Sequence, residues 1–214
     1  MVDIAAAVQE AGTVRRATAD ELPQLARVLA AAFDEDPPTR WVFGDRPLDP
    51  GFLLFLRRIW FPQDECYTTA NVAGACVWER PGEWKLGIGT QLRLAPAMAR
   101  TFGSRLPRIG RAITAMEADH PEREHYYLPF VGVAPEWQGR GLGAALMKPI
   151  LDRCDREGIP AYLEASTPRN RALYERLGFV TTEELSIGKG APPIWRMWRE
   201  VSAATTARAP ARSA

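Results

Sequence analysis

The residue pattern with the clearest chemical meaning is a glycine cluster in the second half of the chain. It follows a nearly continuous apolar run and reads Gln138-Gly-Arg-Gly-Leu-Gly143-Ala144. The apolar run predicts a buried strand, and the residues after the cluster are typical of a helix. The first N–H groups of a helix lack partners, and the helix dipole adds positive charge there. Glycines let an anion approach those groups because no Cβ stands in the way. The cluster therefore predicts a site for a phosphate-bearing ligand.

Three kinds of phosphate-binding loop compete for this cluster. A P-loop requires G-x-x-x-x-G-K-[ST], and Gly143 is followed by Ala-Ala-Leu-Met-Lys-Pro, so that pattern fails. A dinucleotide fingerprint fits better, because the cluster matches G-x-G-x-x-A and Glu164 lies 20 residues after Ala144. That fingerprint needs its first glycine at the strand end, whereas five residues separate Val133 from Gly139. The context therefore disfavours a dinucleotide.

The third pattern, Q/R-x-x-G-x-G/A, accounts for the whole segment. Gln138, Gly141 and Gly143 stand at its defined positions in residues 131–143. This pattern resembles the acetyl-CoA-binding signature of the GNAT superfamily of N-acyltransferases. Downstream, Leu173-Tyr-Glu-Arg-Leu-Gly-Phe179 resembles the second signature of that superfamily, L-Y-x-x-x-G-F. Two signatures in the right order, separated by one predicted helix and one predicted strand, make the resemblance specific over about residues 125–180.

Within the superfamily, the chain resembles puromycin N-acetyltransferase and its relatives. In that group the N-terminal half shapes the acceptor pocket, and here it matches only loosely, so the resemblance does not carry the identity of the substrate. The runs that support it are Ala30-Ala-Ala-Phe33, Tyr127-Leu128, Val131-Gly-Val133, the glycine cluster, Leu163-Glu-Ala-Ser166, Pro168-Arg-Asn170, Tyr174-Glu-Arg-Leu-Gly-Phe179 and Trp195-Arg-Met197.

The resemblance implies an α/β fold of three layers. A mixed, mostly antiparallel sheet of six or seven strands would hold a central parallel pair that splays apart, with helices on both faces. The pantetheine arm of acetyl-CoA would enter the splay, and the amides of residues 139–144 would hold the pyrophosphate. No metal is implied. The residues implied for cofactor binding are Val131, Gly132, Val133, Gln138, Gly139, Arg140, Gly141, Leu142, Gly143, Ala144, Asn170 and Tyr174.

The implied reaction is direct attack of a small-molecule primary amine, antibiotic-like or a metabolite, on the acetyl thioester in a ternary complex. It needs a neutral amine, a donor to the developing oxyanion and a proton for the departing thiolate. By its family position Tyr174 is the general acid, with an expected pKa of ~10. Glu164, at a strand end, is the candidate base, acting through a water. His125 is a second candidate, because imidazole titrates near neutrality.

One position departs from the family pattern, and two alternatives to this function stay open. Many members carry a cofactor-contacting Asn seven residues before the tyrosine, where this chain has Thr167, and Asn170 stands only four before Tyr174. The loop therefore looks shortened. The alternatives are an acetyl-CoA-binding regulatory module without turnover and a protein or peptide N-terminal acetyltransferase.

The acceptor side of the site has weaker signals. Asp34-Glu-Asp36, after the first long predicted helix, either attracts a cationic amine or forms an exposed acidic turn. Trp41, Trp60 and Trp84 either line an aromatic pocket or pack in the core.

Composition narrows the partners. The length of 214 residues suggests one domain, and 46% hydrophobic with 25% charged residues is ordinary for a globular chain. Lys+Arg is 27 against 26 Asp+Glu, a balance that disfavours general binding to nucleic acid or anionic membranes. The longest apolar stretch is broken by Arg57 and Arg58, far short of the ~20 residues that span a bilayer, and no secretory signal is visible. We expect a cytoplasmic monomer or homodimer that binds acetyl-CoA and an amine.

The cysteines and histidines suggest no metal site. Cys66, Cys76 and Cys154 form no C-x-x-C pair, and His120 and His125 supply no zinc-finger spacing. We expect buried, reduced thiols.

Hydrophobic periodicity and turn residues divide the chain into one domain, residues 13–201, between loose tails at 1–12 and 202–214. The pattern at residues 82–120 predicts interrupted helices. From 84 to 116 this segment carries Lys85 and five arginines and no acid. These basic residues form either an anion site or a solvated basic face. The other predicted helices are 18–33, 52–60, one that the glycine cluster at 138–144 opens and that ends at 157, and 168–177. The predicted strands are 14–18, 65–69, 73–79, 126–133, 159–165, 179–187 and 194–201.

Overall fold

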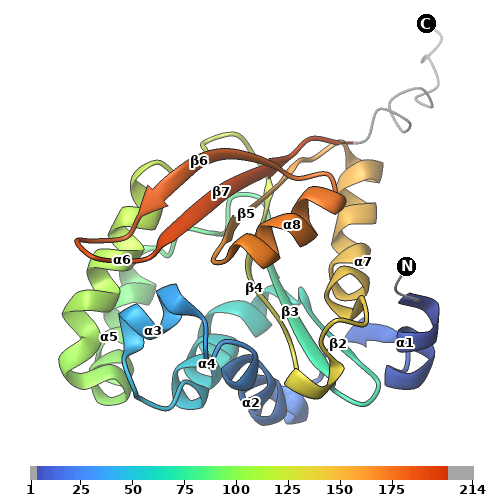
Figure 1. Ribbon diagram of the computed structural model, residues 1–214. Coiled ribbons are helices and arrows are strands. Elements are labelled where there is room, and N and C mark those ends of the chain that lie inside the picture. The colour runs from blue at the N-terminus through green and yellow to red at the C-terminus, as the bar shows by residue number, and fades with distance from the viewer. Residues whose placement is uncertain (1–3, 202–214) are drawn as a thin grey trace, which may run out of the picture.

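The structure, a computed structural model, describes residues 4–201. A seven-stranded sheet runs through it in the order β1-β2-β3-β4-β5-β7-β6 (Figure 1). All neighbouring strands are antiparallel except β4 and β5, which are parallel, so the predicted sheet is confirmed. The strands are β1 (Val14–Arg16), β2 (Cys66–Thr69), β3 (Gly74–Glu79), β4 (Tyr126–Val133), β5 (Ala161–Ala165), β6 (Val180–Ser186) and β7 (Pro193–Arg199).

Helices cover both faces of this sheet. One face carries α7 and α8, and the other carries α2 and α4 (Figure 1). No helix within residues 4–201 combines the length and apolar character needed to cross a bilayer. The α-helices are α1 (Ile4–Ala11), α2 (Leu22–Ala32), α3 (Pro37–Phe43), α4 (Asp49–Phe55), α5 (Ile88–Phe102), α6 (Leu106–Ala118), α7 (Leu142–Glu157) and α8 (Pro168–Arg176).

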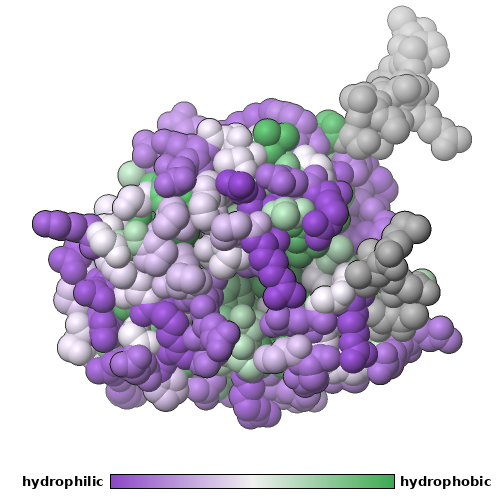
Figure 2. Space-filling model, viewed as in Figure 1, coloured by the Kyte–Doolittle hydropathy of each residue, from purple (hydrophilic) through white to green (hydrophobic). Residues whose placement is uncertain are grey.

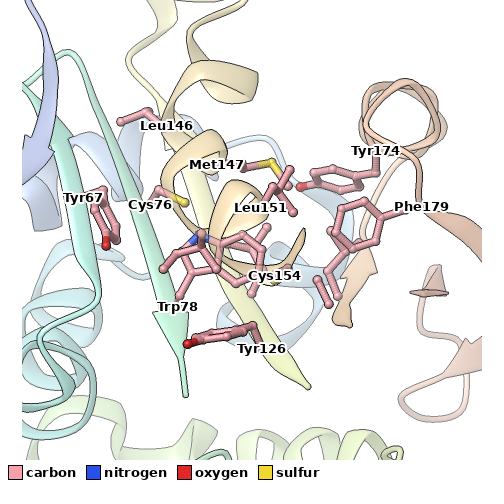
Figure 3. Close-up of a cluster of buried hydrophobic side chains, with 14 of the residues drawn as sticks. Tyr67, Cys76, Trp78, Tyr126, Leu146, Met147, Leu151, Cys154, Tyr174 and Phe179 are labelled. Carbon is pink, nitrogen blue, oxygen red and sulfur yellow. The ribbon is translucent and has the colours of Figure 1, made fainter. Parts of the chain in front are cut away.

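Strand β3 lies at the centre of the core, because every one of its side chains is buried. Alternate residues of a strand point to opposite faces. Cys76 and Trp78 accordingly pack with Met147 of α7 in one cluster, drawn in Figure 3, and Ala75 and Val77 join α2 and α4 in a second. Full burial of a large side chain contributes roughly 1.5–3 kcal/mol, so this two-sided packing fixes β3 and its neighbour β4 as a rigid base for the site.

Strands β4 and β5 separate partway along their length. Their pairing runs from Tyr126 opposite Ala161 to Leu128 opposite Leu163, while β4 continues to Val133 with only β3 beside it. Pro129, which has no N–H to donate, follows the last paired position of β4. The predicted parallel pair therefore splays beyond Leu128.

The N-terminal region differs from the expected loose tail. Residues 4–11 form α1, whose Ala11 is fully buried in the cluster beneath α7, and Val8 packs against the same cluster. This packing orders a segment that has little apolar periodicity of its own. The predicted tail at 202–214 lies outside the described residues, as do residues 1–3.

Two further helices differ from the prediction. The Pro37-Pro38 pair begins a helix that was not predicted, α3, because Asp36 caps it by accepting the Thr39 N–H at 3.1 Å. The preceding helix, α2, has already ended at Ala32. The predicted helix at 52–60 is α4 followed by a π-helical segment, η2 (Leu56–Trp60).

The chain between β3 and β4, residues 80–125, forms a helical insertion built from α5 and α6. It packs against α3 and the β6–β7 hairpin through a third apolar cluster that includes Val42, Phe102 and Ile194. Arg108 stacks on the Trp41 ring at 4.8 Å and donates to its carbonyl at 2.9 Å, which attaches α6 to α3. The basic side chains of this insertion thus lie on its surface or brace α3, as a solvated basic face would.

Candidate active site

A cavity of about 290 Å³ lies where β4 and β5 separate. Residues 128–131 of β4 form one wall, Glu164 and Tyr174 a second, and Glu79 ends β3 at a third. The insertion closes the cavity from a fourth side through Trp84, among others. Figure 2 shows apolar surface in a hollow near the middle of the face that is viewed.

Tyr174 is held in this cavity by the start of α8. Thr167 caps the helix, because its hydroxyl accepts the Asn170 N–H at 3.1 Å, and Pro168 occupies the first turn. The tyrosine is 7% exposed and joins the cluster drawn in Figure 3, and it lines the same cavity as Val131. Burial raises the pKa of its phenol above the ordinary value that the sequence suggested. The phenol therefore stays protonated at neutral pH and can act only as a proton donor.

Glu164 lies near the end of β5 and also lines the cavity. Its Oε1 accepts the hydroxyl of Tyr162 at 2.8 Å. Loss of water around it raises the pKa of Glu164 to about 7, although hydrogen bonds from Tyr162 and Tyr127 and the charge of Arg196 oppose the rise. A carboxyl with this pKa is about half ionised near neutrality, which suits a general base.

Glu79 is a second buried carboxyl in the cavity, and sequence reasoning missed it. It is 5% exposed, and its Oε1 accepts the indole N–H of Trp60 at 3.0 Å. Burial raises its pKa to about 8, and the like charge of Glu164 adds to the rise. The available signal was an acid that ends an otherwise apolar strand, Gly74-Ala-Cys-Val-Trp-Glu79.

The two histidines form a buried pair beside the cavity. His125 Nδ1 lies 2.6 Å from the Arg123 carbonyl, and the two Nε2 atoms are 3.0 Å apart. Because a carbonyl only accepts, His125 carries its proton on Nδ1 and accepts at Nε2 from His120. Burial lowers the pKa of both, that of His120 to about 3. His125, the second candidate base, does not line the cavity, whereas His120 does and keeps a free acceptor at Nδ1.

The glycine cluster lies at the N-terminus of α7. Gly139 and Gly141 have φ angles of 77° and 84°, in the left-handed region that other residues rarely adopt. The first helical N–H with a backbone acceptor is that of Ala145, bonded to the Gly141 carbonyl at 3.2 Å, so the preceding amides are left for a ligand. Residues 138–140 are exposed. The loop therefore has the geometry expected of a phosphate site.

Two other predicted cofactor residues, Gln138 and Arg140, use their side chains in contacts within the protein. Gln138 donates to the Val133 carbonyl at 3.1 Å, one of the groups expected to pair with pantetheine. Arg140 lies over the Trp137 ring and pairs with Glu10 at 3.0 Å. Each of these side chains already has a protein partner.

Four of the predicted cofactor positions can offer little besides backbone atoms. A Cβ on Gly132 would lie 2.8 Å from the Ala32 side chain, so this glycine lets α2 pack on β4. Leu142 is 1% exposed in the core, and Gly143 and Ala144 follow it in the first turn of α7. Asn170 does line the cavity, and its amide donates to Ser166 at 3.3 Å.

Of the acidic turn and the three tryptophans, some residues line the cavity and others hold the helices in place. Asp34 pairs with Arg40, and Asp36 reaches the cavity but caps α3. Trp60 and Trp84 line the cavity, whereas Trp41 lies under Arg108. The cysteines are free and buried, as expected, and burial raises the pKa of Cys66 and Cys154 to about 12, so neither thiol is an activated nucleophile.

Comparison with known proteins identifies a family for part of the chain. The Acetyltransferase (GNAT) family matches residues 108–179, which hold β4, the glycine cluster, β5 and α8. An uncharacterized N-acetyltransferase of Schizosaccharomyces pombe is 37% identical over 108 residues, which cover 50% of this chain and 41% of that protein. The mycothiol acetyltransferase of Streptomyces coelicolor is 40% identical over 78 residues, 35% of this chain and 24% of that protein. The chain thus spans less than half the length of these curated relatives.

Likeness in three dimensions extends over most of the chain. A crystal structure from Corynebacterium glutamicum, described as histone acetyltransferase HPA2 and related acetyltransferase, superposes with a TM-score of 0.69. It is 25% identical and covers 90% of this chain and 97% of its own. Sequence and structure indicate the same family. The matching sequence segment contains both the splayed parallel strands and the glycine cluster before α7. Residues 108–179 thus form a segment of the Acetyltransferase (GNAT) family, within a fold that is similar to that of an acetyltransferase of known structure.

Proposed function

We propose that this protein transfers the acetyl group of acetyl-CoA to the primary amine of a small molecule. The observation that carries the proposal is the meeting of Tyr174, Glu164 and the unpaired part of β4 around one cavity. A phenol that keeps its proton and a carboxyl that titrates near neutrality are the acid and base that aminolysis of a thioester requires.

The donor would bind along the splay and the glycine cluster. Left-handed Gly139 and Gly141 and the free amides at the start of α7 fit a pyrophosphate, because donors converge there without a Cβ. Backbone groups of Val131 and Val133 face the gap left by β5 and would pair with the pantetheine amides. When bound, acetyl-CoA supplies the activated acyl group.

In the proposed reaction the neutral amine nitrogen forms a bond to the acetyl carbon while the carbon–sulfur bond breaks. Tyr174 gives its proton to the departing sulfur, and Glu164 receives the surplus proton of the nitrogen through a water. Solvent then restores both groups, so the net products are the amide and free CoA. The raised pKa of the phenol makes proton transfer to sulfur unfavourable by itself, and the step is completed because solvent returns a proton to Tyr174 and the thiol of free CoA holds its proton at neutral pH.

The cavity supports a small acceptor over a long peptide. The helical insertion narrows it with Trp84, His120 and residues of α6, so the space beside Glu164 has walls on several sides. The enclosed volume of about 290 Å³ suits a compact organic amine.

Release of CoA thiol from acetyl-CoA, followed with a panel of small amines and one peptide with a free N-terminus, tests the proposal. We expect turnover with a small amine. Binding of acetyl-CoA by calorimetry without turnover on any amine would instead support a regulatory module, and turnover on the peptide alone would support an N-terminal acetyltransferase.

A further inference from the structure

The charged residues that line the cavity are all acidic. Among residues 4–201 these are Asp36, Glu79, Glu117 and Glu164, and no lysine or arginine lines it. The Asp36 carboxylate is already used in capping α3, because its Oδ2 accepts hydrogen bonds from both the N–H and, at 2.8 Å, the hydroxyl of Thr39. Such a cavity repels anions and concentrates cations. Its occupant beside the acetyl donor is therefore expected to carry positive charge.

Glu79 is the carboxyl with an unused oxygen. The indole of Trp60 fixes Oε1, while Oε2 is buried and has no hydrogen-bond partner among the described residues. A buried polar atom left unpaired costs roughly 1–3 kcal/mol, so an N–H donor placed in the cavity would remove a penalty that the empty site carries. An ammonium group supplies the donor, and its positive charge favours the ionised form of Glu79 against the burial that raises the pKa of this carboxyl to about 8.

Aromatic rings line the same cavity as this carboxyl. The rings of Trp60 and Phe130 lie 5.2 Å apart. Tyr127 is the register partner of Glu79, and its ring meets His120 edge-on at 5.0 Å. Trp84 stacks on His120 at 3.7 Å. Ring faces attract organic cations, and His120 Nδ1 adds an acceptor that stays neutral.

We propose that Glu79 selects the acceptor by binding its ammonium group through Oε2, with Trp60, Trp84 and Phe130 enclosing the apolar part of the molecule. The inference rests on the proposed acetyl transfer and names its substrate class, a compact cationic amine with an aromatic or apolar body. The bound ammonium gives one proton to solvent before the neutral nitrogen attacks, and Glu164 keeps its separate role as the acceptor of the second proton.

Phenethylamine and 2-phenylethanol test the inference, because they share a body and differ in the charged group. The variants are Glu79→Gln, which keeps the shape and removes the charge, and Glu122→Gln, an exposed control outside the cavity. Direct binding is measured by quenching of tryptophan fluorescence, and turnover by release of CoA thiol. We expect Glu79→Gln to weaken phenethylamine binding roughly 30-fold or more, as for other broken buried charge pairs. Binding of 2-phenylethanol and the KM for acetyl-CoA should stay within about two-fold.

The two readouts separate failure of the inference from failure of the proposed function. If the wild type binds phenethylamine but does not turn it over, and Glu79→Gln loses that binding, the inference is retained and the transfer activity is overturned. Equal affinity of wild type and Glu79→Gln for phenethylamine, or no binding by the wild type at millimolar concentration, would overturn the inference. If circular dichroism shows that Glu79→Gln does not fold, Trp60→Phe, which removes the Oε1 donor, is used, and an unchanged affinity there counts against the inference.

Discussion

Glu79 and Glu164 face one cavity from the two strands that flank β4, and Tyr127 lies on the strand between them. Tyr127 is the register partner of Glu79, and its hydroxyl acts to lower the pKa of Glu164. Each carboxylate disfavours ionisation of the other, so they lose their protons one after the other as a coupled pair. The cavity thus holds one carboxyl that ionises near neutrality and another that ionises above it, which suits separate roles.

The first prediction concerns the pH profile of Glu164. A base must be ionised to accept a proton, and its pKa of about 7 places the gain in ionised form between about pH 6 and 8. We expect kcat/KM for the amine to rise through that range and kcat to fall by roughly 10²-fold or more in Glu164→Gln. The neighbouring groups that also act on this titration are Glu79, Tyr127, Tyr162 and Arg196. A profile that keeps its rising limb in Glu164→Gln would assign the limb to another group.

The second prediction concerns Tyr174 as the acid. Tyr174→Phe removes only the hydroxyl, so acetyl-CoA affinity measured by calorimetry should stay near that of the wild type. We expect turnover to fall at least 10-fold, within the general-acid range of ~10²–10⁴. Tyr126→Phe is the matched control, because its hydroxyl bonds to Glu157 at 2.9 Å and does not line the cavity. Unchanged turnover in Tyr174→Phe would remove this phenol from the mechanism.

The third prediction follows from the buried state of Glu79. Its pKa of about 8 lies above the value of ~4.3 for an exposed glutamate, so the folded protein binds its proton more tightly than the unfolded chain does. Stability from this group is complete below pH ~4.3 and is lost as the pH rises through 8. Glutamine does not titrate. As the pH rises from 5 to 9, the wild type should lose stability that Glu79→Gln does not lose. The Tm of the variant relative to that of the wild type should therefore increase by roughly 5 °C or more over this range.

Thermal unfolding of both proteins across that pH range measures this difference, with Glu122→Gln as the exposed control. A difference that stays constant with pH would mean that Glu79 is ionised throughout, and would place its pKa well below 8.

The sequence predicted the parts of the site whose geometry is local. The glycine cluster, the start of α7 and the tyrosine of α8 follow from capping and turn chemistry within a few residues, and their roles toward a ligand stay predictions. Strand β4 is correct at both ends because a buried strand has a continuous apolar signal.

The acceptor side was not predictable in the same way, because long-range packing forms it. Glu79 and Tyr127 meet only through strand register, and Trp84 and His120 meet only because the insertion folds back over the sheet. No spacing in the sequence marks these pairs. Helix α1 was missed for the same reason, since Ala11 gains its burial from α7.

The fourth prediction tests whether the amides at the start of α7 hold the donor. Gly141→Leu forces a side chain into a φ of 84° at the helix cap and projects it where a pyrophosphate would lie. We expect acetyl-CoA binding measured by calorimetry to be abolished. Gly158→Leu is the matched control, because Gly158 has a φ of 73° at the other end of the same helix and open space around it. Both variants carry strain of about 1–3 kcal/mol, but only Gly141→Leu should lose the ligand. Equal loss of affinity in both would trace the effect to instability of α7, and retained affinity in Gly141→Leu would show that the phosphates lie elsewhere.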